Sequence, residues 1–356
     1  MRIAQIAPVA TTIPPPKSGS VELMTSLLTE GLLERGHEVT LFATGDSVTK
    51  AKLHATFPHG YWHDEEMYPW EFYEMVNLSA ACERASEFDI IHYQAAYYPM
   101  SLAFTRLIST PFVQTVHHYP FQSETRLWKR YPEANFVAIS RCQAAALEGL
   151  NCIGTIYNGI ETETFTFNPQ PENYLLFLGR FTAGKGVLEA IEIARRLNVK
   201  LLLAAPEDDY YRQTIKPHVD GKLVEYVGEV DHAGKNKLLG GALALLYPVQ
   251  EGEPFGLVMT EAMACGTPVL ALDKGAVNEI VENGVNGYRV ETLEEMLEIL
   301  PEVLRLDRAK VRASAIEKFD VRQMVDGYIE IYEQILRSKS EPPATARKIF
   351  YESTTR

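Results

Sequence analysis

Residues 2–44 read RIAQIAPVATTIPPPKSGSVELMTSLLTEGLLERGHEVTLFAT. The runs at 2–7 and 37–44 are rich in β-branched and other apolar residues and are bounded by turn formers, which is typical of strands. Residues 21–36 between them place apolar side chains at intervals of three and four, and Gly36 is a plausible C-cap. This stretch therefore predicts strand, helix and strand, the unit of a parallel sheet.

The same alternation continues along the chain in two blocks. Further strands are expected at 89–94, 111–118 and 135–140, and then at 174–180, 200–206, 224–230, 242–249 and 268–273. The later runs are almost continuously apolar, as expected for strands that helices cover on both faces. The sequence therefore predicts an α/β protein with two doubly wound parallel sheets.

The two blocks are separated by TFTFNPQPEN at 164–173, where prolines and polar residues interrupt the periodicity. We expect an N-terminal domain over 1–165 and a C-terminal domain over 170–320. A last amphipathic helix, over 321–340, follows after the second domain is complete. It is expected to pack back on the first domain.

Composition excludes several classes of function. The chain has 356 residues, and its 34 Lys and Arg against 47 Asp and Glu give a net charge of −13. Such a balance disfavours a nucleic-acid-binding surface and a polybasic membrane anchor. The N-terminus carries no signal-peptide pattern, so a cytoplasmic protein is expected. The four cysteines form no C-x-x-C pair, which favours free thiols over a disulfide framework or a zinc site.

The segment EGEPFGLVMTEAMACGTPVLALDKG at 251–275 carries the strongest chemical signal. Glu253 is expected on a loop, and Glu261, eight positions later, inside the helix that follows. Free backbone N–H groups at the start of this helix would form an anion site. Carboxylates beside it are suited to accept hydrogen bonds from sugar hydroxyls. The alternative is a capping carboxylate plus a solvated helix residue. The residues expected at the anion site are Phe255, Gly256, Leu257 and Val258.

A second signal is LGRFTAGKG at 178–186, at the end of a predicted strand. Ligands of open α/β sheets bind outside the carboxyl ends of the strands. There, Arg180 and Lys185 would neutralise a diphosphate, although an ordinary solvated loop has a similar pattern. Together with the preceding motif, the pair predicts a site for a nucleoside diphosphate.

Two further segments follow strands of the first block. In PPPKSGSVELM at 14–24, Gly19 and Ser20 would let the backbone approach a phosphate. The segment lacks G-x-G-x-x-G, which counts against an NAD dehydrogenase. In TVHHYP at 115–120, His117 and His118 end a strand, where a structural and a catalytic histidine are both plausible.

The stretch from 54 to 75 is aromatic and acidic, and it is expected to be largely a loop. The spacing of His54, His59 and His63 matches no defined metal site. Cys265 has no evident base beside it and is expected to pack in the core. Aromatic residues near these segments are interpreted as stacking platforms for a sugar or as ordinary packing. They are Tyr61, Trp62, Tyr68, Trp70, Tyr97, Tyr98 and Tyr119.

Together, these motifs resemble the retaining glycosyltransferase family 4, whose GT-B fold has two Rossmann-like domains facing across a cleft. The resemblance covers almost the whole chain and implies that Arg180 and Lys185 hold the donor diphosphate. It further implies that Glu253 binds the transferred sugar, Glu261 the ribose, and that His117 lies beside the reacting sugar. The turn around Gly228 would bind the base through backbone groups. One departure is Ser20, where family members often have a second glycine.

The resemblance implies transfer of a hexose, with retention, from a nucleotide diphosphate sugar to a small-molecule or glycan acceptor. UDP-glucose is the first expectation for the donor and GDP-mannose the second. No cofactor or metal is expected, since the chain has no D-x-D motif. The alternatives are a GT-B-type sugar-nucleotide epimerase and a catalytically silent nucleotide-sugar binding protein.

Overall fold

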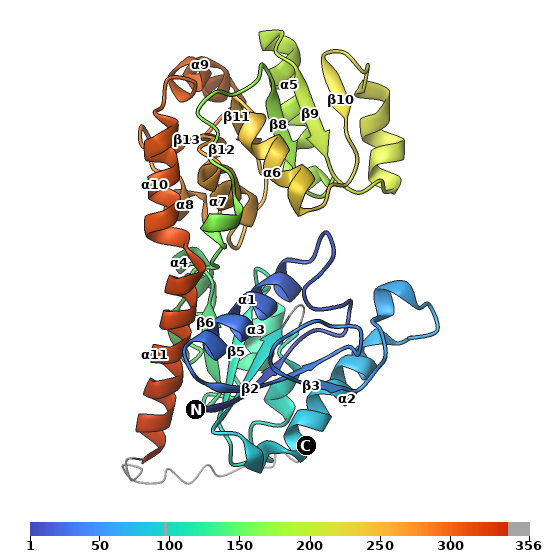
Figure 1. Cartoon of the computed structure of the whole chain (residues 1–356), viewed down its shortest axis with the longest axis vertical. Coiled ribbons are helices and arrows are strands. Elements are labelled where there is room, and N and C mark those ends of the chain that lie inside the picture. Colours follow the sequence, from blue (N-terminus) through green and yellow to red (C-terminus); the bar gives the residue numbers. More distant parts are fainter. Residues whose placement is uncertain (96–97, 341–356) are drawn as a thin grey trace, which may run out of the picture.

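The computed structural model describes residues 1–95 and 98–340. It contains two parallel sheets, which lie one above the other along the long axis of the molecule (Figure 1). The N-terminal sheet has seven strands in the order β3-β2-β1-β4-β5-β6-β7, and the C-terminal sheet has six in the order β10-β9-β8-β11-β12-β13. In each sheet the chain starts in the middle, moves to one edge and then crosses to the other half. This is the doubly wound topology that the sequence predicts.

The N-terminal sheet is covered by helices on both faces. Its strands are β1 Arg2–Ile6, β2 Glu38–Ala43, β3 Lys52–Ala55, β4 Ile90–Ala95, β5 Phe112–Val116, β6 Asn135–Ala138 and β7 Cys152–Thr155. Its helices are α1 Ser20–Glu34, α2 Trp70–Glu83, α3 Gln122–Trp128 and α4 Arg141–Ala146. Apolar side chains of α1 and α2 pack into separate clusters, so the sheet is buried between two layers.

The C-terminal sheet has the same layered construction. Its strands are β8 Leu175–Leu178, β9 Leu201–Ala204, β10 Val224–Tyr226, β11 Ala244–Tyr247, β12 Val269–Leu272 and β13 Gly287–Val290. Its helices are α5 Val187–Leu197, α6 His232–Gly241, α7 Leu257–Ala264, α8 Val277–Ile280, α9 Leu293–Val303 and α10 Arg308–Phe319. Short 3₁₀ or π turns lie at Tyr61–His63, Ala85–Glu87, Met100–Ala103, Thr162–Thr164, Ala183–Lys185, Tyr211–Ile215 and Lys216–His218. No helix in the described part of the chain has the length and apolar character needed to cross a membrane.

The last helix, α11 Val321–Ser340, leaves the C-terminal domain and runs along the N-terminal domain (Figure 1). Its apolar side chains, including Val325 and Ile331, belong to the same buried cluster as Ile3 of β1 and Met24 of α1. The amphipathic pattern of this segment is therefore satisfied by the first domain.

Strands β3, β7 and β13 were not predicted from the sequence. Each lies at an edge of its sheet, and each has only four residues, most of them partly exposed. An edge strand is not covered on all sides, so it lacks the continuous apolar run that marks a central strand. The expected loop from 54 to 75 was also partly wrong, because His54 lies in β3 and Trp70 begins α2.

A carboxylate of α8 connects the two domains. The Glu279 side chain is only 4% exposed and accepts hydrogen bonds from the backbone N–H groups of Arg141 and Cys142, at 2.8 and 2.7 Å. It also accepts one from the Tyr157 hydroxyl, at 2.8 Å. A carboxylate of the C-terminal domain thus binds the first turn of α4 in the N-terminal domain.

We expect Glu279→Ala to lower the free energy of unfolding by about 2–3 kcal/mol, because it removes three hydrogen bonds to a charged acceptor and leaves their donors without a partner. Thermal unfolding followed by circular dichroism would measure the loss. Glu282→Ala is the matched control, since Glu282 lies on the same segment and forms an exposed ion pair with Lys318. Equal melting temperatures for the two variants would contradict the assigned role.

Candidate active site

A cavity of about 370 Å³ lies between the two domains. On the N-terminal side it is lined by the loop between β1 and α1 and by residues just after β5, β6 and β7. On the C-terminal side it is lined by residues at or beyond the ends of β8, β9, β10 and β11. The carboxyl ends of both sheets therefore face one space, where ligands of such sheets bind.

The cavity brings together most of the residues that the sequence singled out. Those that line it are Gly19, Ser20, His117, Arg180, Lys185, Glu253, Phe255, Gly256, Leu257, Val258 and Glu261. Gly228 does not line it. It occupies the turn after β10 with a φ of 83°, and the cavity wall begins at the next residue, Glu229.

The start of α7 forms one wall of the cavity. Gly256 precedes the helix with a φ of 94°, a conformation that favours glycine, and an added Cβ would come within 2.7 Å of the Tyr247 hydroxyl. The N–H groups of Leu257 and Val258 have no acceptor among the residues that the structure describes. Because both residues line the cavity, their amides and the positive end of the helix are available to an anion.

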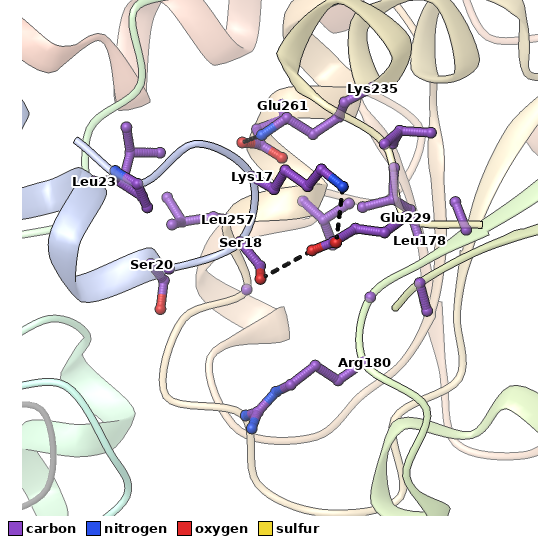
Figure 2. A pocket seen from close by; sticks show the side chains of 18 of the residues that line it. Lys17, Ser18, Ser20, Leu23, Leu178, Arg180, Glu229, Lys235, Leu257 and Glu261 are labelled. Carbon is purple, nitrogen blue, oxygen red and sulfur yellow. Dashed lines mark hydrogen bonds and ion pairs between the residues drawn. The ribbon is translucent and has the colours of Figure 1, made fainter. Parts of the chain in front are cut away.

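Arg180 extends from the segment after β8 into the cavity (Figure 2). Its side chain is exposed and forms no hydrogen bond or ion pair with any residue in the described ranges. A guanidinium without a protein partner, on the same cavity as the start of α7, is available for a ligand with a phosphate or carboxylate group.

The other predicted cation is already paired. Lys185 ends the short turn before α5, and its ammonium group donates to a carboxylate oxygen of Glu253. Both side chains are mostly buried. The two residues were expected to contact different parts of a donor, and the structure shows that their side chains reach one point of the cavity. A ligand phosphate would compete with Glu253 for the Lys185 ammonium.

A second Lys–Glu pair lies deeper in the C-terminal domain. Glu261 of α7 is almost fully buried and accepts a hydrogen bond from Lys235 of α6 (Figure 2). Lys235 was not singled out from the sequence. The signal that was available is its position in the first turns of a helix that directly follows a predicted strand. The ion pair fixes the position of the Glu261 carboxylate at the cavity wall.

The domains also touch across the mouth of the cavity. Lys17 and Ser18, in the loop after β1, reach Glu229 in the loop after β10 (Figure 2). The Lys17 ammonium lies 3.4 Å from one Glu229 oxygen, and the Ser18 hydroxyl donates to the other at 3.2 Å. Sequence reasoning missed this contact, because the residues are more than 200 positions apart.

Gly19 and Ser20 form the transition from this loop into α1. Gly19 has a φ of 141°, and an added Cβ would lie 2.9 Å from an oxygen of Glu22 and from Pro15. The glycine is therefore required by the turn itself. Burial raises the pKa of Glu22 beneath this loop. Ser20 is the first residue of α1 and lines the cavity. Where family members often have a second glycine, this protein therefore has a hydroxyl group at the cavity.

The two histidines after β5 have different surroundings. His117 lines the cavity and pairs through Nε2 with Oε1 of Gln94, at 2.8 Å. Burial, with a smaller contribution from His118, lowers the pKa of His117 to about 3. His118 lies outside the cavity lining, and its Nε2 is 3.2 Å from both oxygens of Glu124. His118 thus has a structural partner, and His117 is the histidine that a ligand can reach.

Each histidine of the 54–75 stretch has its own partner. His54 contacts Arg84, His59 pairs with Asp64, and His63 lies 3.4 Å from Thr11. The described residues contain no cluster of three or more side chains suited to hold a metal ion.

None of the aromatic residues proposed as stacking platforms lines the cavity in the described part of the chain, and Tyr97 lies outside that part. Tyr61 and Trp70 pack against each other, with ring centroids 5.8 Å apart, and Trp70 stacks on Tyr98 at 6.4 Å. Packing therefore accounts for these three. Cys265 is fully buried, and burial raises the pKa of its thiol to about 12, which agrees with a packing role.

Two family descriptions together match residues 21–318. "Glycosyltransferase Family 4" matches residues 21–164, and "Glycosyl transferases group 1" matches residues 161–318. A phosphatidyl-myo-inositol mannosyltransferase from Mycobacterium leprae is 25% identical over 291 residues, which is 72% of this chain and 76% of the relative.

Solved structures show the same fold. A sucrose-phosphate synthase from Thermosynechococcus elongatus superposes with a TM-score of 0.76 at 20% identity, covering 95% of this chain and 99% of that one. HepE from Anabaena, solved with UDP and glucose, has a TM-score of 0.71 at 18% identity, covering 94% and 100%. The GT-B arrangement expected from the sequence is thereby confirmed. The chain is an enzyme of glycosyltransferase family 4.

Proposed function

We propose that this enzyme transfers a hexose from a nucleotide diphosphate sugar to an acceptor hydroxyl, with retention of configuration at the anomeric carbon. The observation that carries the proposal is the unpaired Arg180 guanidinium in the same cavity as the free amides of α7. Such a combination of a fixed cation and helix N–H groups suits a diphosphate.

In this proposal the diphosphate binds between Arg180, Lys185 and the first turn of α7. Negative charge grows on the diphosphate as the bond to the sugar breaks, so these groups stabilise the transition state more than the bound substrate. When Lys185 turns to a phosphate oxygen, the Glu253 carboxylate is released to accept hydrogen bonds from sugar hydroxyls.

The nucleoside would extend over the C-terminal sheet. The buried Glu261 carboxylate, held by Lys235, is suited to accept hydrogen bonds from the ribose hydroxyls. The segment after β10, next to Gly228, would contact the base. In this proposal the transferred sugar lies beside Glu253 and His117, which line the same cavity from opposite domains.

The acceptor hydroxyl would attack the anomeric carbon from the face that the diphosphate leaves. The bond between that carbon and the phosphate oxygen breaks, a bond to the acceptor oxygen forms, and the acceptor proton passes to the departing phosphate. Configuration is retained without a covalent sugar intermediate, so Glu253 binds the sugar and is not a nucleophile. Closure of the two domains would exclude water from this step.

UDP-glucose is the first candidate for the donor and GDP-mannose the second. HepE, which has the same fold, is described in complex with UDP-glucose, and the M. leprae relative is named a mannosyltransferase. For the acceptor, a net charge of −13 favours a small molecule or a glycan over an anionic lipid surface.

Thermal shift of the full chain against UDP, GDP, ADP and their sugars tests this proposal. One nucleotide at a hundredfold its Kd is expected to stabilise the protein by about 2.7 kcal/mol. Glu261→Ala should abolish the ligand-induced shift, because the ribose loses its acceptor. Glu302→Ala, which removes an exposed carboxylate elsewhere on the C-terminal domain, should preserve it. A folded protein that none of these ligands stabilises would overturn the proposed donor site.

A further inference from the structure

The central strands of the N-terminal sheet carry polar side chains where an apolar core is expected. Gln5 of β1 is paired in register with His92 of β4, and Gln94 of β4 with Thr115 of β5. All four are at most 2% exposed. Alternate residues of a strand face the same side of a sheet, so these residues and His117 form one polar stripe on one face of the sheet.

The stripe lies under α11. The ring centroids of Tyr328 and Tyr332, both on this helix, lie 5.0 and 5.7 Å from that of His92. Tyr332 is the largest fully buried side chain of the described residues. The C-terminal helix therefore covers the polar stripe with two hydroxyl groups that can continue its hydrogen bonds.

A continuous chain of hydrogen bonds connects the cavity to this helix. It begins with His117 Nε2 to Gln94 Oε1, at 2.8 Å, and continues with Gln94 Nε2 to Gln5 Oε1, at 3.3 Å. Gln5 Nε2 then donates to the Tyr332 hydroxyl at 3.0 Å. The remaining steps join Tyr332 to His92 Nδ1 at 2.6 Å, His92 Nε2 to Thr115 at 2.8 Å, and Thr115 to Tyr328 at 2.8 Å.

The direction of this chain fixes where the protons lie. The amide groups of Gln5 and Gln94 also lie 3.4 Å from His92 Nδ1 and can only donate to it, so Nδ1 is the acceptor. Tyr332, which accepts from Gln5, therefore donates to Nδ1, and His92 donates onward from Nε2. At the other end, the Gln94 carbonyl oxygen can only accept, which requires a proton on His117 Nε2. Burying polar groups is costly unless each has its partner, and here the partners agree along the whole chain.

We propose that Gln94 is a positioning residue that holds His117 as the Nε2–H tautomer and turns its unprotonated Nδ1 toward the sugar in the cavity. In that state Nδ1 accepts a hydrogen bond from a sugar hydroxyl. Among the described residues Nδ1 has no hydrogen-bond partner, and His117 itself lines the cavity. The identity of the ligand as a sugar rests on the proposed function, whereas the tautomer does not.

The surroundings keep His117 uncharged. Its titratable neighbours are His92 across the stripe and His118 beside it, and a positive charge on either would disfavour a second proton on His117. The Glu124 carboxylate pairs with His118. With a pKa of about 3, His117 is neutral at physiological pH, so that one ring nitrogen donates and the other accepts.

The test combines NMR with kinetics on the full chain. In protein labelled with ¹⁵N-histidine, the ring-nitrogen shifts of His117 are expected to show the Nε2–H tautomer between pH 5 and pH 8 (about two units above the pKa and more). A predominant Nδ1–H tautomer would overturn the proposal, because Gln94 would then donate to His117 Nε2 instead of accepting from it.

Gln94→Leu removes the acceptor while keeping a similar volume. We expect it to populate the Nδ1–H tautomer of His117 and to lower kcat about tenfold, with an unchanged Kd for the free nucleoside diphosphate. Gln114→Leu is the matched control. Gln114 is fully buried in β5, and it accepts a hydrogen bond from Ser101, which does not belong to the hydrogen-bond chain between His117 and Tyr328. It is expected to lower stability and to leave both kcat and the His117 tautomer unchanged.

Two results would contradict the assignment of Gln94. One is a Gln94→Leu protein whose His117 tautomer is the same as in the parent chain. The other is an equal loss of kcat in Gln94→Leu and Gln114→Leu, which would show that kcat falls because the N-terminal domain is destabilised and not because His117 changes its tautomer. If no nucleotide sugar binds, the proposed function fails, and the tautomer spectrum still decides the role of Gln94.

Discussion

Arg180→Ala is expected to lower kcat by about 10²–10³, the range found when one preorganised donor to a developing negative charge is removed. The reason is that Arg180 is the cation of the cavity that has no protein partner in the described residues, so its charge is fully available to the leaving diphosphate. Steady-state kinetics with the nucleotide sugar found in the thermal-shift panel would measure the loss.

The fold should be unaffected by this change. Arg180 is exposed and forms no ion pair in the described ranges, so the melting temperature of Arg180→Ala should match that of the parent chain. Arg212→Ala is the control for loss of a positive charge from the same domain, because Arg212 pairs with Asp209 and Glu207 on the surface. A turnover number for Arg180→Ala equal to that of Arg212→Ala would remove Arg180 from the mechanism.

Glu253→Gln is the second substitution for which we expect a large effect. The amide keeps the size of the side chain but loses the charge that pairs with Lys185 and accepts hydrogen bonds from the sugar. We expect kcat/KM for the nucleotide sugar to fall about 100-fold, since charged hydrogen bonds are worth about 1.5–3 kcal/mol. Binding of the free nucleoside diphosphate, which has no sugar, should be retained.

Calorimetric titration of Glu253→Gln with the diphosphate and with the nucleotide sugar separates these contributions. A variant that loses both affinities equally would show that Glu253 acts through Lys185 and not through the sugar. A variant that retains full kcat/KM would contradict a direct role. Glu251→Gln is a suitable control, because Glu251 lies two residues away on the same loop and does not line the cavity.

The central part of each sheet was predictable because its strands are buried on both faces. Runs such as 175–178 and 201–204 are continuously apolar, and this pattern follows directly from their environment. The edge strand at Lys52–Ala55 has no such pattern. Its position depends on pairing with β2, which is a tertiary interaction that local sequence does not encode.

The same distinction applies to the site. Glu253, Gly256 and Glu261 lie within one short motif that begins at the end of a strand, so their neighbourhood was visible in the sequence. The contact of Lys17 with Glu229 joins two domains, so no local sequence pattern predicts it. Lys235 was overlooked for a related reason, because its partner Glu261 lies on another helix.

The polar stripe was also missed, although the sequence held a signal. In the strand at 89–94, His92 and Gln94 alternate with apolar residues in a run that was otherwise predicted to be buried. Polar residues at alternate positions of a central strand require partners, which predicts a buried network even where the partners are unknown. Here Gln94 pairs with Gln5 and His117, whereas His92 pairs with Tyr332 of α11, more than 200 residues later.

The most direct test of retaining sugar transfer is the configuration of the released sugar. The best-binding nucleotide sugar, which carries an α-linked hexose if it is UDP-glucose, would be incubated with the full chain without acceptor and followed by ¹H NMR. For a retaining enzyme, the nucleoside diphosphate and the α-anomer of the free hexose are expected to appear first, before mutarotation. Initial release of the β-anomer, or an epimerised sugar in place of hydrolysis, would contradict retaining sugar transfer.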